Sequence, residues 1–283
     1  MSWQLLLLIS ILFLSLNGLF HRSLMKDDDS SAVAQTIVFM GIEGFIAIII
    51  AVSRGKLQLS VPPGLIINFI IIAVFMTLAY VLKYRGFKLL NASEVSIFSS
   101  TSKMWNLVGA AIFLHEAVTL QRVLGAIVIL LGIAITIYIN KKFQVNKGIL
   151  FVLLGAILFG LTDINGYYIL QRMDASNYQI YASFLPVFTL LLFMPRSIKK
   201  IPYYFKVDRT IKVGLLSLCD TFGMLALFFA YQAGGQASVI GPLSATKIII
   251  TVFLAMLFLR ERSHMTNKIL GAIVSVAGVI LLL

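Results

Sequence analysis

The chain has 283 residues, of which 60% are apolar and only 12% are charged. Soluble domains carry about 25% charged residues, so the composition excludes a soluble enzyme, a disordered chain and, with one cysteine, a disulfide scaffold. A net charge of +12 would favour a nucleic-acid partner in a polar chain. In so apolar a chain it indicates basic loops beside a bilayer.

Ten apolar windows follow one another, each close to the roughly 20 residues that cross a bilayer as a helix. The windows cover residues 3–20, 34–53, 64–84, 92–113, 119–139, 149–172, 175–195, 212–232, 236–259 and 266–283. None shows the alternation of a membrane-barrel strand. We therefore expect an all-α membrane protein with ten transmembrane helices. The first window lacks the preceding basic segment of a signal peptide, so we interpret it as the first span.

Basic residues concentrate in the loops after the odd-numbered windows. Lys83, at the end of the third window, is counted with Arg85 and Lys88 in the loop after it, and residues 196–212 form a basic stretch after the seventh. Because lysine and arginine are enriched on the cytoplasmic side of membrane proteins, we expect these loops in the cytoplasm. Both termini should then lie outside, and we expect a bacterial inner membrane as the location.

The two halves of the sequence resemble each other. Leu-Gly-Ala-Ile-Val at 124–128 recurs at 270–274, and a glycine follows each copy at the same distance, at Gly132 and Gly278. Such self-similarity is the mark of an internal repeat. A unit of five spans must enter the membrane from the opposite side in its second copy. The sequence therefore predicts two inverted repeats, residues 1–143 and 144–283, a construction that recurs in secondary transporters.

These anchors also carry a family resemblance. Glu116 and Glu261 close the fourth and ninth spans, just after the windows 92–113 and 236–259, and each precedes the glycine pattern. With this signature the chain resembles, over essentially its whole length, the EamA type of the drug/metabolite transporter superfamily. The resemblance implies a ten-helix basket, a central cavity and alternating access. It implies no substrate, because the superfamily carries amino acids, nucleotide sugars, sugar phosphates, choline and drugs. One departure is that Pro242 matches a proline common in the family's ninth span, whereas the fourth window has none.

Charged residues interrupt several windows near their centres. A charge at the centre of a span costs about 2.5–3.5 kcal/mol on the insertion scale. Such residues must therefore pair, contact water, change protonation state or bind a ligand. They are Glu43, Lys103, Asp163, Asp220 and Lys247.

The two lysines are partners in the repeat, so both ammonium groups can converge on one cavity. Two like charges repel unless an anion lies between them, and hydroxyl groups beside ammonium groups suit phosphate or carboxylate oxygens. The superfamily's plastid sugar-phosphate translocators are similar in holding phosphate with lysines on these two spans. The alternatives are structural pairing of each lysine with an acid, or a deprotonated lysine. The candidate substrate-binding residues are Lys103, Lys247, Ser99, Ser100, Thr246, Tyr80 and Tyr231.

The acids have a separate interpretation. Burial favours the neutral form of a carboxyl group, which allows it to carry a proton during transport. With three acids and two lysines, one acid lacks a partner. We expect Asp163 or Asp220, with Glu43 as a further candidate, to couple transport to protons. An ion pair or a hydrogen bond between helices is the alternative.

The sequence thus predicts a secondary transporter of a small anionic metabolite, either an organic phosphate or a carboxylate, coupled to protons. The alternative is an exporter of amino acids or amphipathic cations that uses the intramembrane acids as counter-charges. A membrane-embedded partner subunit or a lipid-modifying enzyme fits the repeat less well. No motif for a nucleophile, a cofactor or a metal occurs. We therefore expect that the protein is not an enzyme and binds no cofactor. We expect a monomer or a homodimer in which the glycines of the fifth and tenth spans serve packing within the chain or dimerisation.

Overall fold

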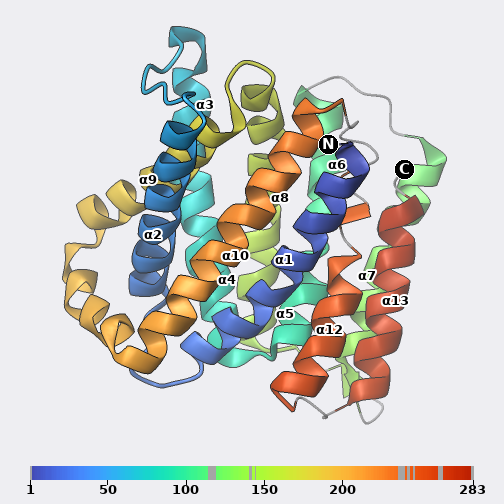
Figure 1. Cartoon of the computed structure of the whole chain (residues 1–283). Helices are drawn as coiled ribbons and strands as arrows, with labels where there is room; N and C mark the ends of the chain where they lie inside the picture. The colour runs from blue at the N-terminus through green and yellow to red at the C-terminus, as the bar shows by residue number, and fades with distance from the viewer. Residues whose placement is uncertain are drawn as a thin grey trace.

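The computed structural model describes residues 2–113, 119–139, 142–143, 145–234, 240, 243–244, 246–260 and 264–281. Within these ranges the chain is a bundle of helices, with one hairpin of two-residue strands. The amino end of α1 and the carboxyl end of α13 lie at the same end of the bundle (Figure 1). The family anchors Glu116, Glu261 and Pro242 lie outside the described residues.

The first half consists of helices that run back and forth across the bundle. Its elements are α1 (Trp3–Met25), α2 (Ala32–Ser53), η1 (Pro63–Leu65), α3 (Ile66–Ile71), η2 (Ile72–Met76), α4 (Thr77–Leu89), α5 (Ala92–Ser99), α6 (Ser102–Phe113), α7 (Leu120–Ile137), β1 (Tyr138–Ile139) and β2 (Lys142–Phe143). Tyr138 pairs with Phe143 in the antiparallel hairpin that joins the two halves.

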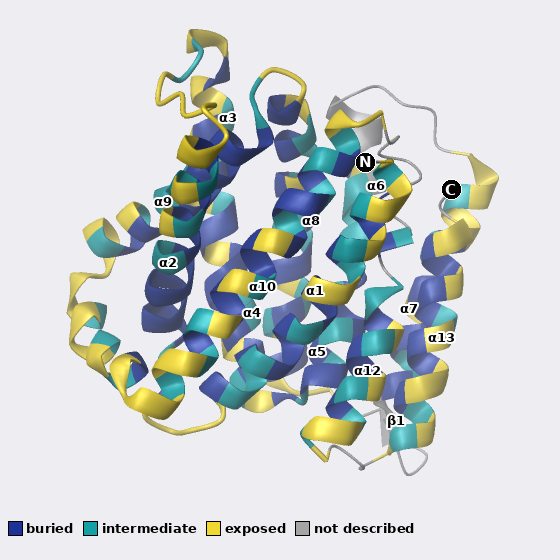
Figure 2. Ribbon diagram, viewed as in Figure 1, coloured by how far each residue is buried: buried dark blue, intermediate teal, exposed yellow. Residues whose placement is uncertain are grey.

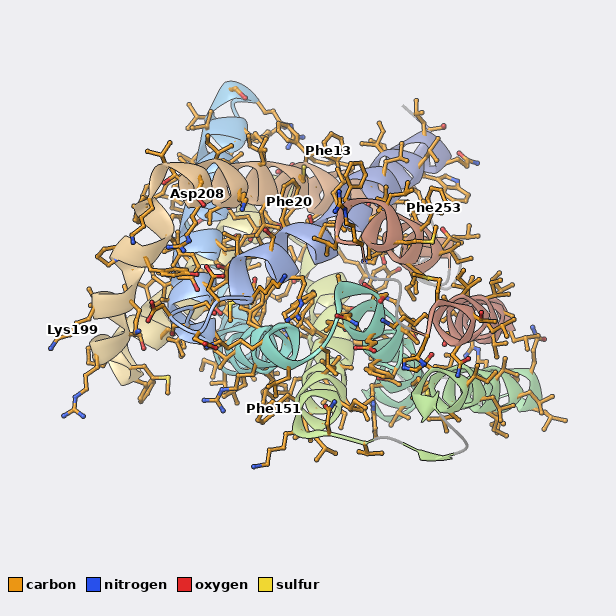
Figure 3. All side chains as sticks on the ribbon, turned by 90° about the horizontal axis from the view of Figure 1, so that it is seen from below. Phe13, Phe20, Phe151, Lys199, Asp208 and Phe253 are labelled. Carbon is orange, nitrogen blue, oxygen red and sulfur yellow. The ribbon has the colours of Figure 1, made fainter. Side chains whose placement is uncertain are left out.

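The second half repeats this course. Its elements are α8 (Lys147–Leu170), α9 (Ala175–Phe193), η3 (Pro195–Phe205), α10 (Val207–Gln232), α12 (Lys247–Phe258) and α13 (Met265–Leu281). Seen from below in Figure 3, the basic segment η3 lies at the edge of the bundle and Lys199 extends away from it. Tyr204 anchors η3, because its hydroxyl group donates to the carbonyl of Ser31 at 3.0 Å.

The outer surface of the bundle suits a lipid environment. Figure 2 shows exposed residues on the outward faces of the helices and buried residues on the inward faces. Large apolar side chains such as Ile49, Ile67 and Leu192 are among the exposed ones. Exposure of so many apolar side chains is typical of a membrane-facing surface. By length and composition, five helical segments in the described part can cross a membrane: Trp3–Met25, Ala32–Ser53, Pro63–Leu89, Lys147–Leu170 and Val207–Gln232.

Helix pairing follows the symmetry of the repeat. Helix α1, the first predicted span, packs on α10, the eighth. The contact that the repeat makes equivalent to this one joins α8, the sixth span, to α4 of the third. The pairs α2–α9 and α7–α13 join equivalent helices of the two halves. The all-α class and the two-repeat architecture are therefore confirmed, whereas the number of ten spans stays a prediction.

Close glycine contacts join α7 to α13. A Cβ on Gly132 would lie only 2.7 Å from the carbonyl oxygen of Gly271 and from the amide nitrogen of Ser275. A Cβ on Gly278 would meet the carbonyl oxygen of Gly125 at 2.8 Å. Small residues let helix backbones approach closely in lipid. The glycine pattern therefore serves packing within the chain, as one of the two sequence interpretations expected.

Two predicted spans differ from the windows that hydropathy indicates. The fourth window, 92–113, divides into α5 and α6 at a turn formed by Ser100 and Thr101. Both hydroxyl groups donate back to carbonyl oxygens three residues earlier, and such local bonds compete with helical ones. The third window was predicted to end at residue 84, but its helix continues to Leu89.

Candidate functional site

A central cavity of about 230 Å³ lies between helices of both halves. Residues of α1, α2, α4, α5, α6, α8, α9, α10 and α12 line it, whereas none from α7 or α13 does among the described residues. Helices α7 and α13, which pack closely through their glycines, are therefore not part of the ring of helices that surrounds the cavity. The walls contain six charged side chains: Glu43, Lys83, Lys103, Asp163, Asp220 and Lys247.

Lys103 and Lys247 both face this cavity, and each occupies the start of a helix. Lys103 is the second residue of α6, directly after the turn at Ser100 and Thr101, and Lys247 is the first residue of α12. The amino end of a helix carries a partial positive charge, which adds to the charge of the ammonium group. Discontinuous helices that point their amino ends at a central site are a recurrent way to hold anionic groups in transporters.

Lys103 has an acidic neighbour. Its Nζ lies 3.5 Å from Oδ2 of Asp163, and Nδ2 of Asn106 lies 3.5 Å from the same oxygen. A strong charge-assisted bond is about 2.7–2.9 Å long, so this contact is loose. The side chain of Asp163 is 45% exposed. A ligand in the cavity can therefore compete for both partners of the pair.

Lys247 has no carboxylate at ion-pair distance within the described part of the chain. Lys83 and Lys103 are both near enough to repel its charge. Three ammonium groups from three helices thus share one cavity, and only one of them has a carboxylate in contact.

Lys83 corrects the sequence analysis, which counted it among the cytoplasmic loop residues. Helix α4 continues to Leu89, so Lys83 lies more than a turn before the end of the helix and not in a loop, and it lines the cavity. Its Nζ lies 5.9 Å from the ring centre of Tyr80 and 5.4 Å from that of Phe159, within cation–π range. The sequence holds a signal for this placement, because Tyr80, Lys83, Tyr84 and Phe87 follow helical spacing.

Glu43 and Asp220 form a second polar group, on the helices α2 and α10, which pack against each other. Gln179 donates to Oε1 of Glu43 at 2.6 Å, and Asn17 donates to Oδ1 of Asp220. The two carboxyl groups are also within hydrogen-bonding reach of each other. Both side chains are buried, with 1% and 6% of their surface exposed. The sequence predicted both acids but not Gln179, which a run of polar residues at the start of α9 could have indicated.

The structure brings together all but one of the predicted site residues. Ser99, Ser100, Tyr80 and Tyr231 line the cavity beside the charged groups. Thr246 does not line it, and its hydroxyl group donates to the carbonyl of Leu243 at 2.8 Å. Among the described residues, no group of three His, Cys, Asp or Glu side chains is placed to hold a metal ion.

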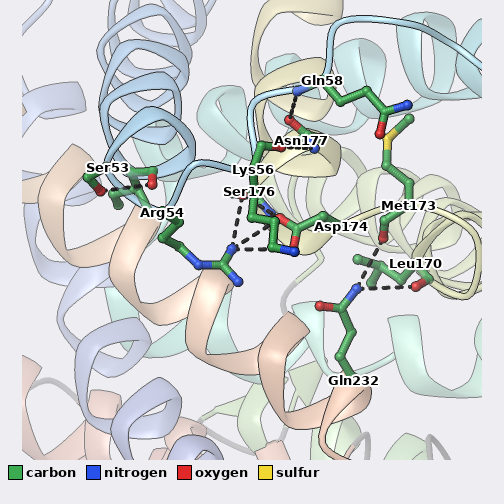
Figure 4. A network of polar contacts seen from close by, with 11 residues as sticks. Ser53, Arg54, Lys56, Gln58, Leu170, Met173, Asp174, Ser176, Asn177 and Gln232 are labelled. Carbon is green, nitrogen blue, oxygen red and sulfur yellow. Dashed lines mark hydrogen bonds and ion pairs between the residues drawn. The ribbon is translucent and has the colours of Figure 1, made fainter.

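A separate polar network closes one end of the bundle (Figure 4). Arg54, at the end of α2, lies 3.1 Å from Asp174 and from the hydroxyl of Ser176, at the start of α9. Asn177 holds the chain after α2, since it accepts a bond from the amide of Gln58 at 3.0 Å. Burial acts to raise the pKa of Asp174, but its hydrogen bonds from Ser176 and the Arg54 charge outweigh this and lower the pKa.

At the opposite end, Asp27 joins the loop after α1 to η3 and α10. Its Oδ2 accepts from the hydroxyl of Tyr203 at 2.7 Å and from Nη2 of Arg209 at 2.9 Å. These two partners lower the pKa of the Asp27 carboxyl group, the Tyr203 hydrogen bond being the largest cause. The cavity thus lies between two polar networks, one at each end of the bundle.

Comparisons with known proteins agree with this architecture. The sequence model of the EamA-like transporter family matches residues 1–138 and 146–283. A crystal structure described only as that of a protein is similar in fold, with a TM-score of 0.62 and 14% sequence identity, and the match covers 99% of this chain and 95% of that chain. No curated protein matches the chain.

Proposed function

The chain belongs to the EamA-like transporter family, and from that premise we propose that it carries a small anionic metabolite across the membrane by alternating access. The family makes it a membrane transporter of the drug/metabolite superfamily with a small-molecule substrate. The anionic class of the substrate and its coupling to protons are our proposal.

The convergence of Lys83, Lys103 and Lys247 on one cavity carries the proposal. Their helices hold three like charges together in a low-dielectric interior, where repulsion between charges is stronger than in water. An anion between the ammonium groups would relieve this repulsion, and Lys247 and Lys83 have no competing ion pair in the described part of the chain. We assign Lys247 as the main contact and Lys103 as a second contact that Asp163 releases on binding.

The rest of the cavity supports an organic phosphate or a carboxylate. Ser99 and Ser102 place hydroxyl groups on the cavity wall beside Lys103, and hydroxyl donors bind anionic oxygens well. Tyr231 and Tyr80 present aromatic rings to the same space. The volume of about 230 Å³ is smaller than that of most ligand pockets, which span about 300–1,000 Å³, and therefore favours a small metabolite.

For orientation, we propose that the end carrying η3 faces the cytoplasm. Basic residues of η3 and of the neighbouring loops gather there, including Arg196, Lys199 and Lys200, and the positive-inside rule places such loops in the cytoplasm. Both termini would then lie on the outer side, in keeping with a bacterial inner membrane.

Export of amino acids or amphipathic cations is the second candidate. The observation in its favour is Asp163, whose carboxylate is half-exposed in the cavity and loosely bound to Lys103. A cationic substrate could take the place of Lys103 beside this acid, and Tyr167 and Tyr231, 5.7 Å apart, offer aromatic faces.

A thermal-shift screen of the purified full-length protein separates the two candidates. We expect phenyl phosphate, benzoate or succinate to raise the melting temperature, and Lys247→Gln to abolish the rise. Lys206→Gln, which removes a lysine outside the cavity, is the matched control and should behave as the unmodified protein. Stabilisation by tyramine or tetraphenylphosphonium alone, unchanged in Lys247→Gln, would contradict the proposal and favour the second candidate.

A further inference from the structure

Two carboxyl groups remain in the cavity wall without a cation in contact within the described part of the chain. Glu43 and Asp220 are brought together because α2 and α10 run side by side. One turn earlier, the hydroxyl group of Ser217 donates to the carbonyl of Phe39 at 3.2 Å. This bond sets the register of the two helices, so the next turn of each places the two acids opposite each other.

The hydrogen bonds of this pair are incomplete. Each carboxyl group receives one amide donor, Glu43 from Gln179 and Asp220 from Asn17. The other oxygens, Oε2 of Glu43 and Oδ2 of Asp220, are buried and have no donor. A buried acceptor without a donor is costly, and two carboxylates in contact repel each other. One proton held between the two groups removes both problems, since it neutralises one acid and supplies a donor to the other.

We propose that Glu43 and Asp220 share one proton, and that this proton moves together with the anion in a proton–anion symport. The first part stands on the geometry of the pair alone. The second part rests on the proposed function, because it needs an anion at Lys247.

The charge count of the cavity explains why the two would move together. With the proton in place, three ammonium groups face two carboxylates, and the cavity has room for one negative charge. Once the proton leaves, three carboxylates balance the three ammonium groups, and an anion loses its attraction. By linkage, an anion that binds more tightly to the protonated cavity must also hold the proton more tightly.

Other titratable groups surround the pair on each neighbouring helix. Lys83 of α4 and Lys247 of α12 are cations whose charges act on Asp220. Tyr80 and Tyr84 of α4 lie within electrostatic range of both acids, and Cys219 adjoins Asp220 on α10 itself. Asp163 lies farther along the cavity beside Lys103 and is the matched acid for a control.

Infrared difference spectroscopy between acidic and alkaline pH tests the shared proton without any substrate. The full-length protein should show the carbonyl band of a protonated carboxyl group that disappears on alkalinisation. Glu43→Gln and Asp220→Asn should each abolish this band, because the new amide replaces the proton as a donor. Asp163→Asn should leave it. A band that is absent from the unmodified protein, survives both substitutions or vanishes in Asp163→Asn would overturn the inference.

Binding of phenyl phosphate, benzoate and succinate across the same pH range tests the coupling. We expect affinity to fall about 5- to 150-fold, the usual range of coupling between sites, as the carboxyl band disappears. In Glu43→Gln the affinity should not change with pH. Binding that is independent of pH in the unmodified protein would refute symport and the proposed coupling to protons, and would leave the proposed anionic substrate standing. A titrating band in a protein that binds no anion would refute the proposed function instead.

Discussion

At the scale of single residues, the sequence identified five of the six charged residues that line the cavity and missed the sixth. Charged residues within apolar windows are rare and costly, so Lys103, Lys247 and the three acids were identifiable from sequence alone, and all five line one cavity. Lys83 was missed because it lies near the end of a span, where a lysine is ordinarily a loop or interface residue. Its inward direction depends on where α4 ends, which local hydropathy does not determine.

Asp163→Asn distinguishes the two candidate substrates by the sign of its effect. The change removes a carboxylate that competes with an anion for Lys103, so anion affinity should rise by about tenfold, or about 1.4 kcal/mol. A cationic substrate would instead lose its counter-charge. Isothermal titration with the anion found in the thermal-shift screen measures the difference. A loss of affinity would mean that Asp163 contacts the substrate directly.

Asp27 gives a pH dependence outside the membrane. Because its pKa is lowered in the folded protein, chiefly by the Tyr203 hydrogen bond, the carboxylate stabilises the fold above its unfolded pKa. This contribution is lost as the pH falls through the folded pKa. Asp27→Asn should therefore lower the melting temperature at neutral pH, and the difference should vanish in acid. The pair is exposed, and such pairs contribute about 0.2–1 kcal/mol. An equal difference at all pH values would show that Asp27 acts through packing.

At the scale of helices, hydropathy predicted where most spans lie but not where they break. An apolar window reports enough length to cross the bilayer, whereas continuity depends on competition for backbone hydrogen bonds. In the fourth span, the hydroxyl groups of Ser100 and Thr101 bond to carbonyl oxygens three residues earlier, in place of regular helical bonds, and the chain turns there. The break places Lys103 at the start of α6, which is where the proposed anion site needs it.

The seam between α7 and α13 gives a prediction at this scale. Gly132→Ala should destabilise the protein, because the new methyl group meets the backbone of Gly271 and Ser275, and overpacking of this kind costs about 1–3 kcal/mol. The control is Gly41→Ala in α2, where a Cβ meets nothing within 4 Å. Thermal unfolding in detergent measures both. Equal stability of the two variants would show that α7 and α13 can move apart to accommodate a methyl group without loss of stability.

At the scale of the whole molecule, the repeat accounts for the position of the site. Equivalent helices of the two halves pair as α2 with α9 and as α7 with α13, and the cavity lies between the halves. The sequence predicted this symmetry from a few repeated residues. It could not predict the polar networks at the two ends, around Arg54 and around Asp27, because their partners are far apart in the chain and come together only through the fold.

The most direct test of the central claim is uptake into proteoliposomes of a labelled anion that binds in the thermal-shift screen. We predict saturable uptake by the unmodified protein and none by Lys247→Gln, while Lys206→Gln transports normally. Uptake of an organic cation by both the unmodified protein and Lys247→Gln, with no uptake of any anion, would contradict the account.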